Sequence, residues 1–225
     1  MPKPIGPALA AIALLLAAAL LWLTPGEPAK PAAKSVEITE MHVSHYRDRG
    51  ATSLGNLRTS TEAIRVNDDV RIAAELSSPA YYYLIAFNPD GEDQLCLPED
   101  DKGRGAPDVR PDRRADVRYP GKESTFVLDA KGLQAFLLAA SSKPLPPYKE
   151  WREGAREIPW MANKDGGAWR WHFDGREFTR FPEDRGKIEP KEAAPESLRK
   201  LCEFFKGRTE FDAVQAIAFP VADEK

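Results

Sequence analysis

Hydrophobic residues are arranged in two different ways along this chain. Near the start they form one continuous run, from Pro7 to Leu23, without a charged or strongly polar side chain. After a Pro-rich interval they recur in short runs, many of which alternate with polar residues. The first pattern is typical of a membrane-spanning helix, and the second is typical of β-strands.

The continuous run is long enough to act as an anchor. As a helix, its 17 residues would be about 25 Å long, at the short end of what spans a bilayer and above the usual signal-peptide core. It has no polar face, which argues against a soluble helix. A cleaved signal peptide is the alternative, but Pro31 stands where cleavage after Ala33 would need a small residue. We expect a single-pass anchor with the C-terminal part outside the cytoplasm.

The chain is therefore expected to have four segments. They are a short N-terminal tail (1–6), the transmembrane anchor (7–23), a Pro/Ala-rich spacer (24–35) and an extracytoplasmic β-rich domain (36–225).

The clearest strand signals lie in the first half of the domain. Residues 70–76 alternate apolar and polar positions, and Ser77-Ser78-Pro79 is expected to end that strand. Tyr81 to Phe87 is apolar or aromatic on both faces, as in a central buried strand. Asn88-Pro89-Asp90-Gly91 has the residues of a type I hairpin turn, and residues 94–97 then supply the partner strand.

The other elements are weaker but complete a consistent pattern. Strands are predicted over 36–46, 124–128, 133–140 and 211–221, a charged loop over 99–118, and a helix over 195–206. The expected fold is mainly β: an antiparallel β-sandwich or meander with one C-terminal helix packed on it, preceded by the transmembrane helix.

An aromatic hairpin is predicted from Trp169 to Arg180, with a two-residue turn at Asp174-Gly175. In that register the facing pairs are Phe173 and Arg176, His172 and Glu177, Trp171 and Phe178, and Trp169 and Arg180. One face is then aromatic and the other polar. If the aromatic face is exposed, it would form a platform that binds a sugar or peptide through Trp169, Trp171, Phe178 and Arg180. Burial in the core is the favoured alternative.

Charge and composition exclude several function classes. The chain has 32 Lys and Arg against 35 Asp and Glu, and the part after residue 34 is the more acidic one, so nucleic acid is not an expected partner. No Gly-x-Ser-x-Gly elbow and no Gly-rich phosphate loop after a strand occurs. We therefore predict no catalytic residues and no cofactor.

Histidine and cysteine give no stronger signal. His42 and His45 fall three apart in a predicted strand, which places them on opposite faces, so no metal site is predicted and both are expected at the surface or a strand edge. Cys96 and Cys202 both lie in core-like settings; a disulfide between them is possible in an oxidising compartment.

Several motifs in order resemble a known family. They are the strand Tyr81–Phe87, the Pro-Asp-Gly turn, Leu97-Pro98, Tyr119-Pro120-Gly121 and the stretch from Leu133 to Pro146. Over about residues 66–150 the chain resembles the bacterial domain-of-unknown-function family 4384. The resemblance implies a β-rich accessory module, in other chains joined to kinases or caspase-like peptidases, parts that this chain lacks.

These observations together favour a non-catalytic domain. We expect a membrane-anchored extracytoplasmic module that binds a partner or ligand, with an unknown protein as partner and a possible accessory role in signalling. A hydrolase with a dispersed active site and a carbohydrate-binding module that uses the Trp169/Trp171 hairpin are the alternatives.

Overall fold

The computed structural model describes residues 35–121, 124–155, 157–181 and 193–223. The predicted anchor and nearly all of the spacer lie outside these ranges. Within them, no helix combines the length and the apolar character that crossing a membrane requires. The elements are β1 (Ile38–Arg47), β2 (Thr52–Asn56), β3 (Asp69–Phe87), β4 (Asp93–Leu97), β5 (Arg114–Tyr119), β6 (Phe126–Val127), β7 (Gly132–Ser141), α2 (Tyr148–Gly154), β8 (Arg170–Phe173), β9 (Phe178–Phe181), α3 (Glu196–Lys206) and β10 (Ala213–Val221).

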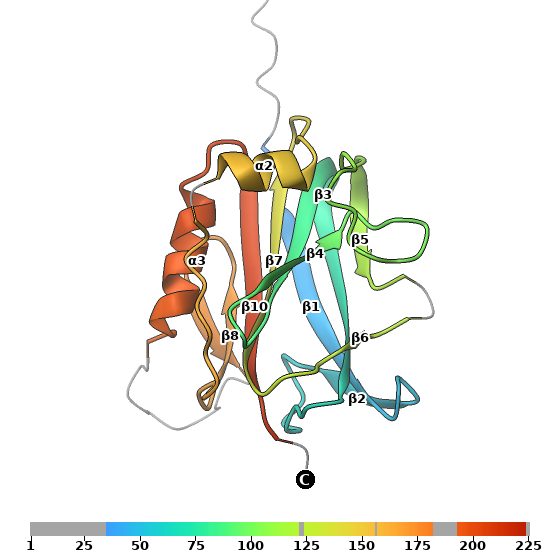
Figure 1. Cartoon of the computed structure of the whole chain (residues 1–225), viewed down its shortest axis with the longest axis vertical. Helices are drawn as coiled ribbons and strands as arrows, with labels where there is room; N and C mark the ends of the chain where they lie inside the picture. Colours follow the sequence, from blue (N-terminus) through green and yellow to red (C-terminus); the bar gives the residue numbers. More distant parts are fainter. Residues whose placement is uncertain (1–34, 122–123, 156, 182–192, 224–225) are drawn as a thin grey trace, which may run out of the picture. The chain divides into compact units, whose positions relative to one another are not determined.

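The strands form one antiparallel sheet, which confirms a mainly β fold with few helices (Figure 1). Its order is β2-β1-β3-β7-β10-β8-β9, and β4, β5 and β6 pair with β3 beside this path. The sheet curves into half a barrel, so strands that are distant in the order approach each other. Gln215 Nε2 on β10 donates a hydrogen bond to the carbonyl oxygen of Ile38 on β1 at 2.7 Å.

The central strand β3 is longer than the sequence predicts. It runs for 19 residues through Ser77-Ser78-Pro79, so the prediction of two strands separated there is wrong. Its first part pairs with β1, β5 and β6, and its second part with β7 and β4. Pairing with β5 shifts register between Glu75 and Ala80. Pro79 therefore lies where an amide donor is not needed, which is how a strand tolerates proline.

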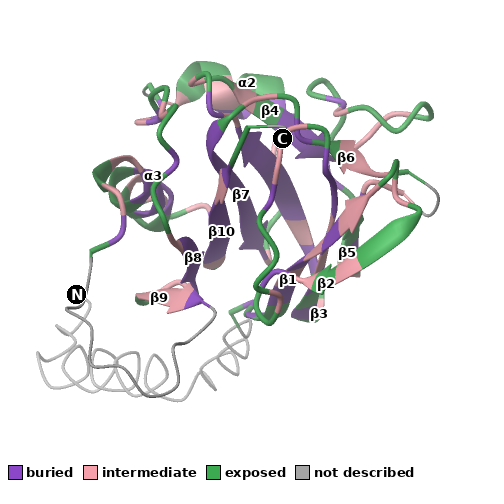
Figure 2. Ribbon diagram, turned by 90° about the horizontal axis from the view of Figure 1, so that it is seen from below, coloured by how far each residue is buried: buried purple, intermediate pink, exposed green. Residues whose placement is uncertain are grey.

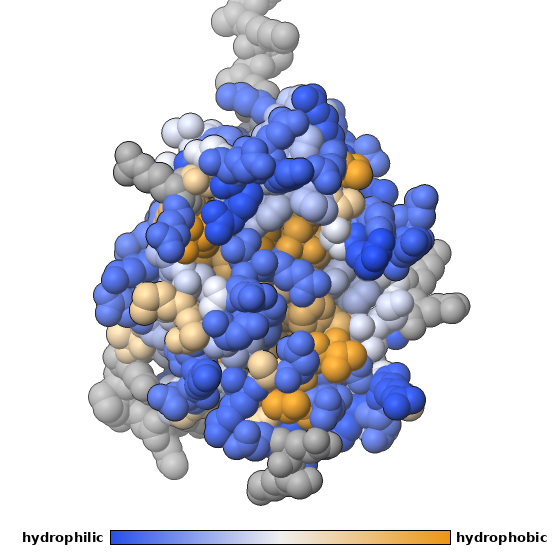
Figure 3. Space-filling view, viewed as in Figure 1, coloured by the Kyte–Doolittle hydropathy of each residue, from blue (hydrophilic) through white to orange (hydrophobic). Residues whose placement is uncertain are grey.

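Alternation along β3 divides the core into two clusters. Even-numbered residues such as Tyr82 and Leu84 pack on the concave face with residues of β1 and β10. Odd-numbered residues such as Tyr83 and Ile85 pack on the other face with α2 and α3. Figure 2 shows the buried strands inside and the exposed side of α2 outside. Hydrophilic residues cover most of the face seen in Figure 3, with apolar residues visible near its middle.

The predicted C-terminal helix is present as α3, whose buried stripe is Leu198, Leu201, Cys202 and Phe205. The sequence did not predict α2, a single short helix that follows Pro147. Trp151 on α2 lies between Tyr83 of the sheet and Phe205 of α3, with ring centroids 5.7 and 5.5 Å away. An aromatic anchor of this kind holds a helix too short to be stable alone.

Two further boundaries differ from the prediction. The charged loop predicted over 99–118 is shorter, because its last residues form β5. Exposed charged residues of β5 alternate with the buried Val117 and Tyr119, so the strand was read as part of the loop. The strand predicted over 124–128 shrinks to the two residues of β6. The hairpin of β3 and β4, β7 and the last strand are confirmed.

Candidate functional site

The aromatic hairpin forms from β8 and β9, but its predicted register is wrong. Phe173 pairs with Phe178 and Trp171 with Arg180, so the connection has four residues, 174–177, instead of two. The carboxylate of Asp174 accepts hydrogen bonds from the amides of Arg176 and Glu177 at 2.8 and 2.9 Å. This side-chain cap favours the wider turn over a tight Asp-Gly turn.

The aromatic face of the hairpin belongs to the core. Trp171 and Phe173 are 5% and 4% exposed, and Phe178 packs on Phe173 with ring centroids 4.8 Å apart. Trp169 is half-buried, and the guanidinium of Arg180 covers its ring at 3.8 Å. The four predicted ligand-binding residues therefore come together, but they offer no exposed plane on which a sugar ring could stack.

The other face of the hairpin was expected to be polar, with His172 and Glu177 as a surface pair; it carries polar side chains, but the surface pair is wrong. His172 faces Thr179, not Glu177, and both His172 and Arg170 are buried. The guanidinium of Arg170 donates to the carbonyl oxygens of Leu57, Ser60 and Glu62, the first at 2.8 Å. A side chain that reads as polar surface therefore joins the hairpin to the connection between β2 and β3.

A buried ion cluster lies on the same concave face. Nε2 of His45 is 2.7 Å from Oδ2 of Asp68, and Nε of Arg47 is 2.9 Å from Oδ1. The amide of Arg65 donates to Oδ2 at 2.9 Å. His45 is completely buried, which corrects the prediction that both histidines of the 42/45 pair are surface or strand-edge residues; only His42 is half-exposed.

The charges of this cluster follow from its surroundings. Burial lowers the pKa of His45 despite the adjacent carboxylate. Burial alone would raise the pKa of Asp68, but the hydrogen bonds from Arg47, His45 and the Arg65 amide together lower it. The pair therefore consists of a neutral imidazole and a carboxylate, so Nε2 carries the imidazole proton and donates a hydrogen bond to Oδ2 of Asp68.

The two cysteines are free thiols in different clusters, so the possible disulfide between them is not formed. Cys96 lies in the concave cluster and Cys202 in the cluster under α3. Burial raises the pKa of Cys96 to about 12 and also raises that of Cys202. Neither thiol is poised as a nucleophile, because the thiolate is the reactive form.

A groove of about 780 Å³, here called the outer groove, opens on the surface of the described residues. It crosses the outward side chains of β1, β3 and β5, reaches Tyr82 of the concave cluster, and is walled by residues 98–101 and 109–112, most of which belong to the segment 99–118 predicted to be a charged loop. Its carboxylates are Glu40, Glu75, Glu99, Asp100, Asp101, Asp112 and Asp116, and its arginines are Arg71, Arg110, Arg114 and Arg118.

Strand register places three of these carboxylates in one row. Glu40 of β1 is the partner of Glu75 of β3, and Glu75 is in turn the partner of Asp116 of β5. All three are exposed on the same face. Like charges directly opposite each other are destabilising in a sheet, so this row needs counter-charge.

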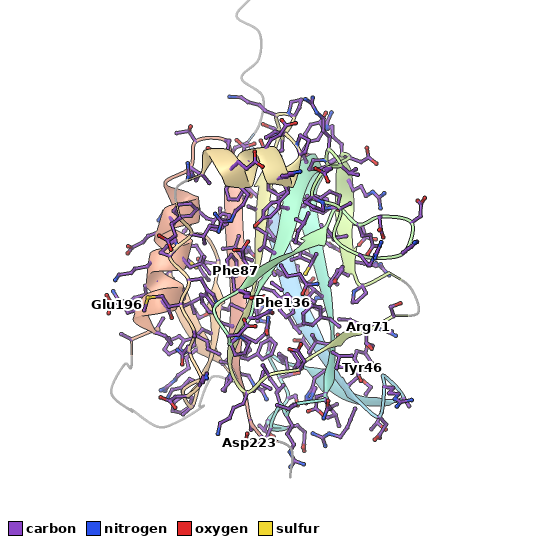
Figure 4. All side chains as sticks on the ribbon, in the orientation of Figure 1. Tyr46, Arg71, Phe87, Phe136, Glu196 and Asp223 are labelled. Carbon is purple, nitrogen blue, oxygen red and sulfur yellow. The ribbon has the colours of Figure 1, made fainter. Side chains whose placement is uncertain are left out.

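The arginines of the outer groove only partly supply that charge. Nε of Arg118 lies 3.0 Å from Oδ2 of Asp116, but both side chains are well exposed. Arg71 donates to the carbonyl oxygen of Ser124 and stacks on the ring of Tyr46 at 5.0 Å, as the labelled side chains in Figure 4 show. It is thereby drawn away from the row of carboxylates.

Two polar groups of the outer groove have no hydrogen-bond partner among the described residues, and one of them, Oε2 of Glu99, is also shielded from water. Tyr82 is 6% exposed, lines the groove and makes no hydrogen bond with any described residue. Oε2 of Glu99 is buried and also has no hydrogen-bond partner among them. Burial raises the pKa of Glu99, and burial likewise raises that of Tyr82.

The sequence could not show this site. Its residues come from three strands and a loop, and their meeting depends on the register of long-range pairs. The one available signal was the alternation of charged residues in 71–75 and 114–118, which places them on the same side of their strands.

Comparison with known proteins gives no relative: no family model, no curated protein and no solved structure matches the chain.

Proposed function

We propose that this chain is a non-catalytic binding domain, tethered to the cell membrane by residues 7–23 and lying outside the cytoplasm. The observation that carries the binding role is the outer groove with its unpartnered Tyr82 and Glu99. Unsatisfied polar groups in a concave site are where a ligand gains hydrogen bonds that water supplies poorly. The apolar run and the Pro/Ala-rich spacer support the tether.

The non-catalytic character is supported by the state of the reactive groups. Both thiols are buried and protonated, and the His45–Asp68 pair is enclosed in the core. The resemblance to domain-of-unknown-function family 4384 agrees with an accessory module that acts through a partner protein, with signalling as the accessory role. A hydrolase remains the second candidate, because the hydrogen-bonded His–Asp pair is half of a nucleophile-activating triad.

Equilibrium dialysis of the full chain in detergent micelles against a bacterial small-molecule extract tests the binding role. Mass spectrometry should find a compound concentrated by the wild type, retained equally by Tyr81→Phe and retained less by Tyr82→Phe. Tyr81→Phe is the matched control, since it removes the neighbouring hydroxyl on the other face of β3. Conversion of an extract component into a new product, abolished by His45→Gln, would instead support the hydrolase.

Cell fractionation tests the tether. The intact chain should sediment with membranes, and Leu15→Arg with Ala18→Arg should release it, because charges at a helix centre oppose insertion. A shortened mature chain would mean that the run is a cleaved signal. Full-length wild type in the soluble fraction would overturn the anchor.

A further inference from the structure

We propose that the outer groove binds a linear organic polycation of the polyamine type. This inference rests on the proposed binding function and names the chemistry of its ligand. It is carried by three features of the groove: the row of carboxylates, the unpartnered acceptors beside it, and apolar surface between the charges.

The carboxylates indicate the sign of the charge and the length of the ligand. Seven carboxylates and four arginines line the outer groove, so negative side chains outnumber positive ones by three. Neighbouring strands are about 4.8 Å apart, so the row Glu40–Glu75–Asp116 extends over about 10 Å. A ligand with several cationic centres along a chain matches this spread better than a single metal ion, whose oxygen ligands lie within about 2.6 Å.

The unpartnered acceptors of Glu99 and Tyr82 indicate where one ammonium group of the ligand binds. The side chains that act electrostatically on Tyr82 are Arg114 first and then Asp116, Glu99 and Asp112, all from the outer groove, so three carboxylates surround it against one guanidinium. A carboxylate oxygen accepts hydrogen bonds, and a phenol oxygen accepts as well as donates. An alkylammonium has three donors and no acceptor, so it can satisfy Oε2 of Glu99 and the Tyr82 oxygen together. A carboxylate or phosphate ligand would leave Glu99 unpaired and add repulsion.

Apolar groups provide contacts for the methylene segments of such a ligand. Val109 is 49% exposed and lines the groove, together with Leu97, Pro98 and Pro111. The ring of Tyr46 also lies in the lining. Alkyl stems pack on apolar surface while their charged ends stay with polar partners, as lysine side chains do.

Isothermal titration of the full chain in detergent micelles with spermine tests this proposal. We expect one saturable site, with affinity that decreases from spermine to putrescine as the number of charges decreases. Glu75→Gln with Asp116→Asn should weaken spermine binding at least tenfold, and Tyr82→Phe should weaken it severalfold. Both variants change only exposed or groove-lining polar atoms, and unchanged thermal unfolding without ligand verifies their folding.

The matched control is Glu153→Gln with Glu203→Gln, which removes the same charge from the exposed sides of α2 and α3. It should bind spermine like the wild type. Equal weakening by this control would reveal nonspecific attraction to an acidic protein and overturn the proposal, as would displacement of spermine by equimolar Mg²⁺ or Ca²⁺. Absence of spermine binding, with another compound retained in a Tyr82-dependent way in the dialysis, would overturn the polyamine ligand and leave the binding function standing.

Discussion

His45 and Asp68 lie 23 residues apart in the chain, and Nε2 of the imidazole is 2.7 Å from Oδ2 of the carboxylate inside the core. Asp68 also accepts hydrogen bonds from Arg47 and from the amide of Arg65. One carboxylate thus fixes the end of β1 to the segment that leads into β3.

Replacement of Asp68 by Asn should destabilise the domain strongly. The change removes the negative charge that offsets Arg47 at a residue that is 3% exposed, and breaking a buried pair costs about 3 kcal/mol or more. Urea denaturation measures the loss. Asp116→Asn, at the surface, should shift stability by less than about 0.5 kcal/mol. A similar small shift for Asp68→Asn would contradict the structural role of the cluster.

Stability should fall as the pH is lowered from 7.5 to 5. Burial lowers the pKa values of His45 and His172 below the ordinary value of 6.5, so the unfolded chain takes up protons that the folded chain does not. The free energy of unfolding therefore rises with pH through this window. His172→Gln should flatten the profile measured by urea denaturation at several pH values. An unchanged slope would show that His172 does not titrate differently in the two states.

Arg170→Met should loosen the connection between β2 and β3. It leaves the carbonyl oxygens of Leu57, Ser60 and Glu62 without their donor, at a cost of about 1–3 kcal/mol for each buried group that water cannot reach. Hydrogen exchange should increase over residues 57–62 and in the hairpin. Arg176→Met, in the exposed turn, is the control and should leave exchange there unchanged.

The two tryptophans of the hairpin should differ in their effect. Trp171→Ala opens a cavity in the core and should cost about 3 kcal/mol or more. Trp169 is half-buried under Arg180, so Trp169→Ala should cost clearly less. Thermal and urea unfolding give both values. Equal losses would mean that the two rings are equally buried.

Neither cysteine should react with a thiol reagent in the folded protein at pH 8. Both are buried, and burial raises the pKa of Cys96 to about 12, so the thiolate is scarce. Two thiols should become reactive in guanidinium chloride without added reductant. Fewer than two would indicate a disulfide.

Local patterns predicted the local structure. The turn at 88–91, the apolar strand that precedes it and the stripe of α3 depend on neighbouring residues, and all three are present. The hairpin at 169–180 was located correctly, but its register was not, because Asp174 caps a wider turn.

The pattern of hydrophobic and polar residues did not predict the structure that depends on contacts between distant parts of the chain. His45, Arg170 and His172 look like surface residues, yet they become buried because partners up to 113 residues away satisfy them or enclose them. The outer groove has the same origin, since the row Glu40–Glu75–Asp116 exists only once three strands have paired.

The uninterrupted course of β3 has a consequence for how the domain comes apart. Nineteen residues serve both curved halves of the sheet, and each half takes its hydrogen bonds from the same backbone. If β3 breaks anywhere, both halves of the sheet lose the strand with which they pair. Unfolding of the domain should therefore be all-or-none, and no fragment of the chain that ends within β3 should retain one half of the sheet in its native form.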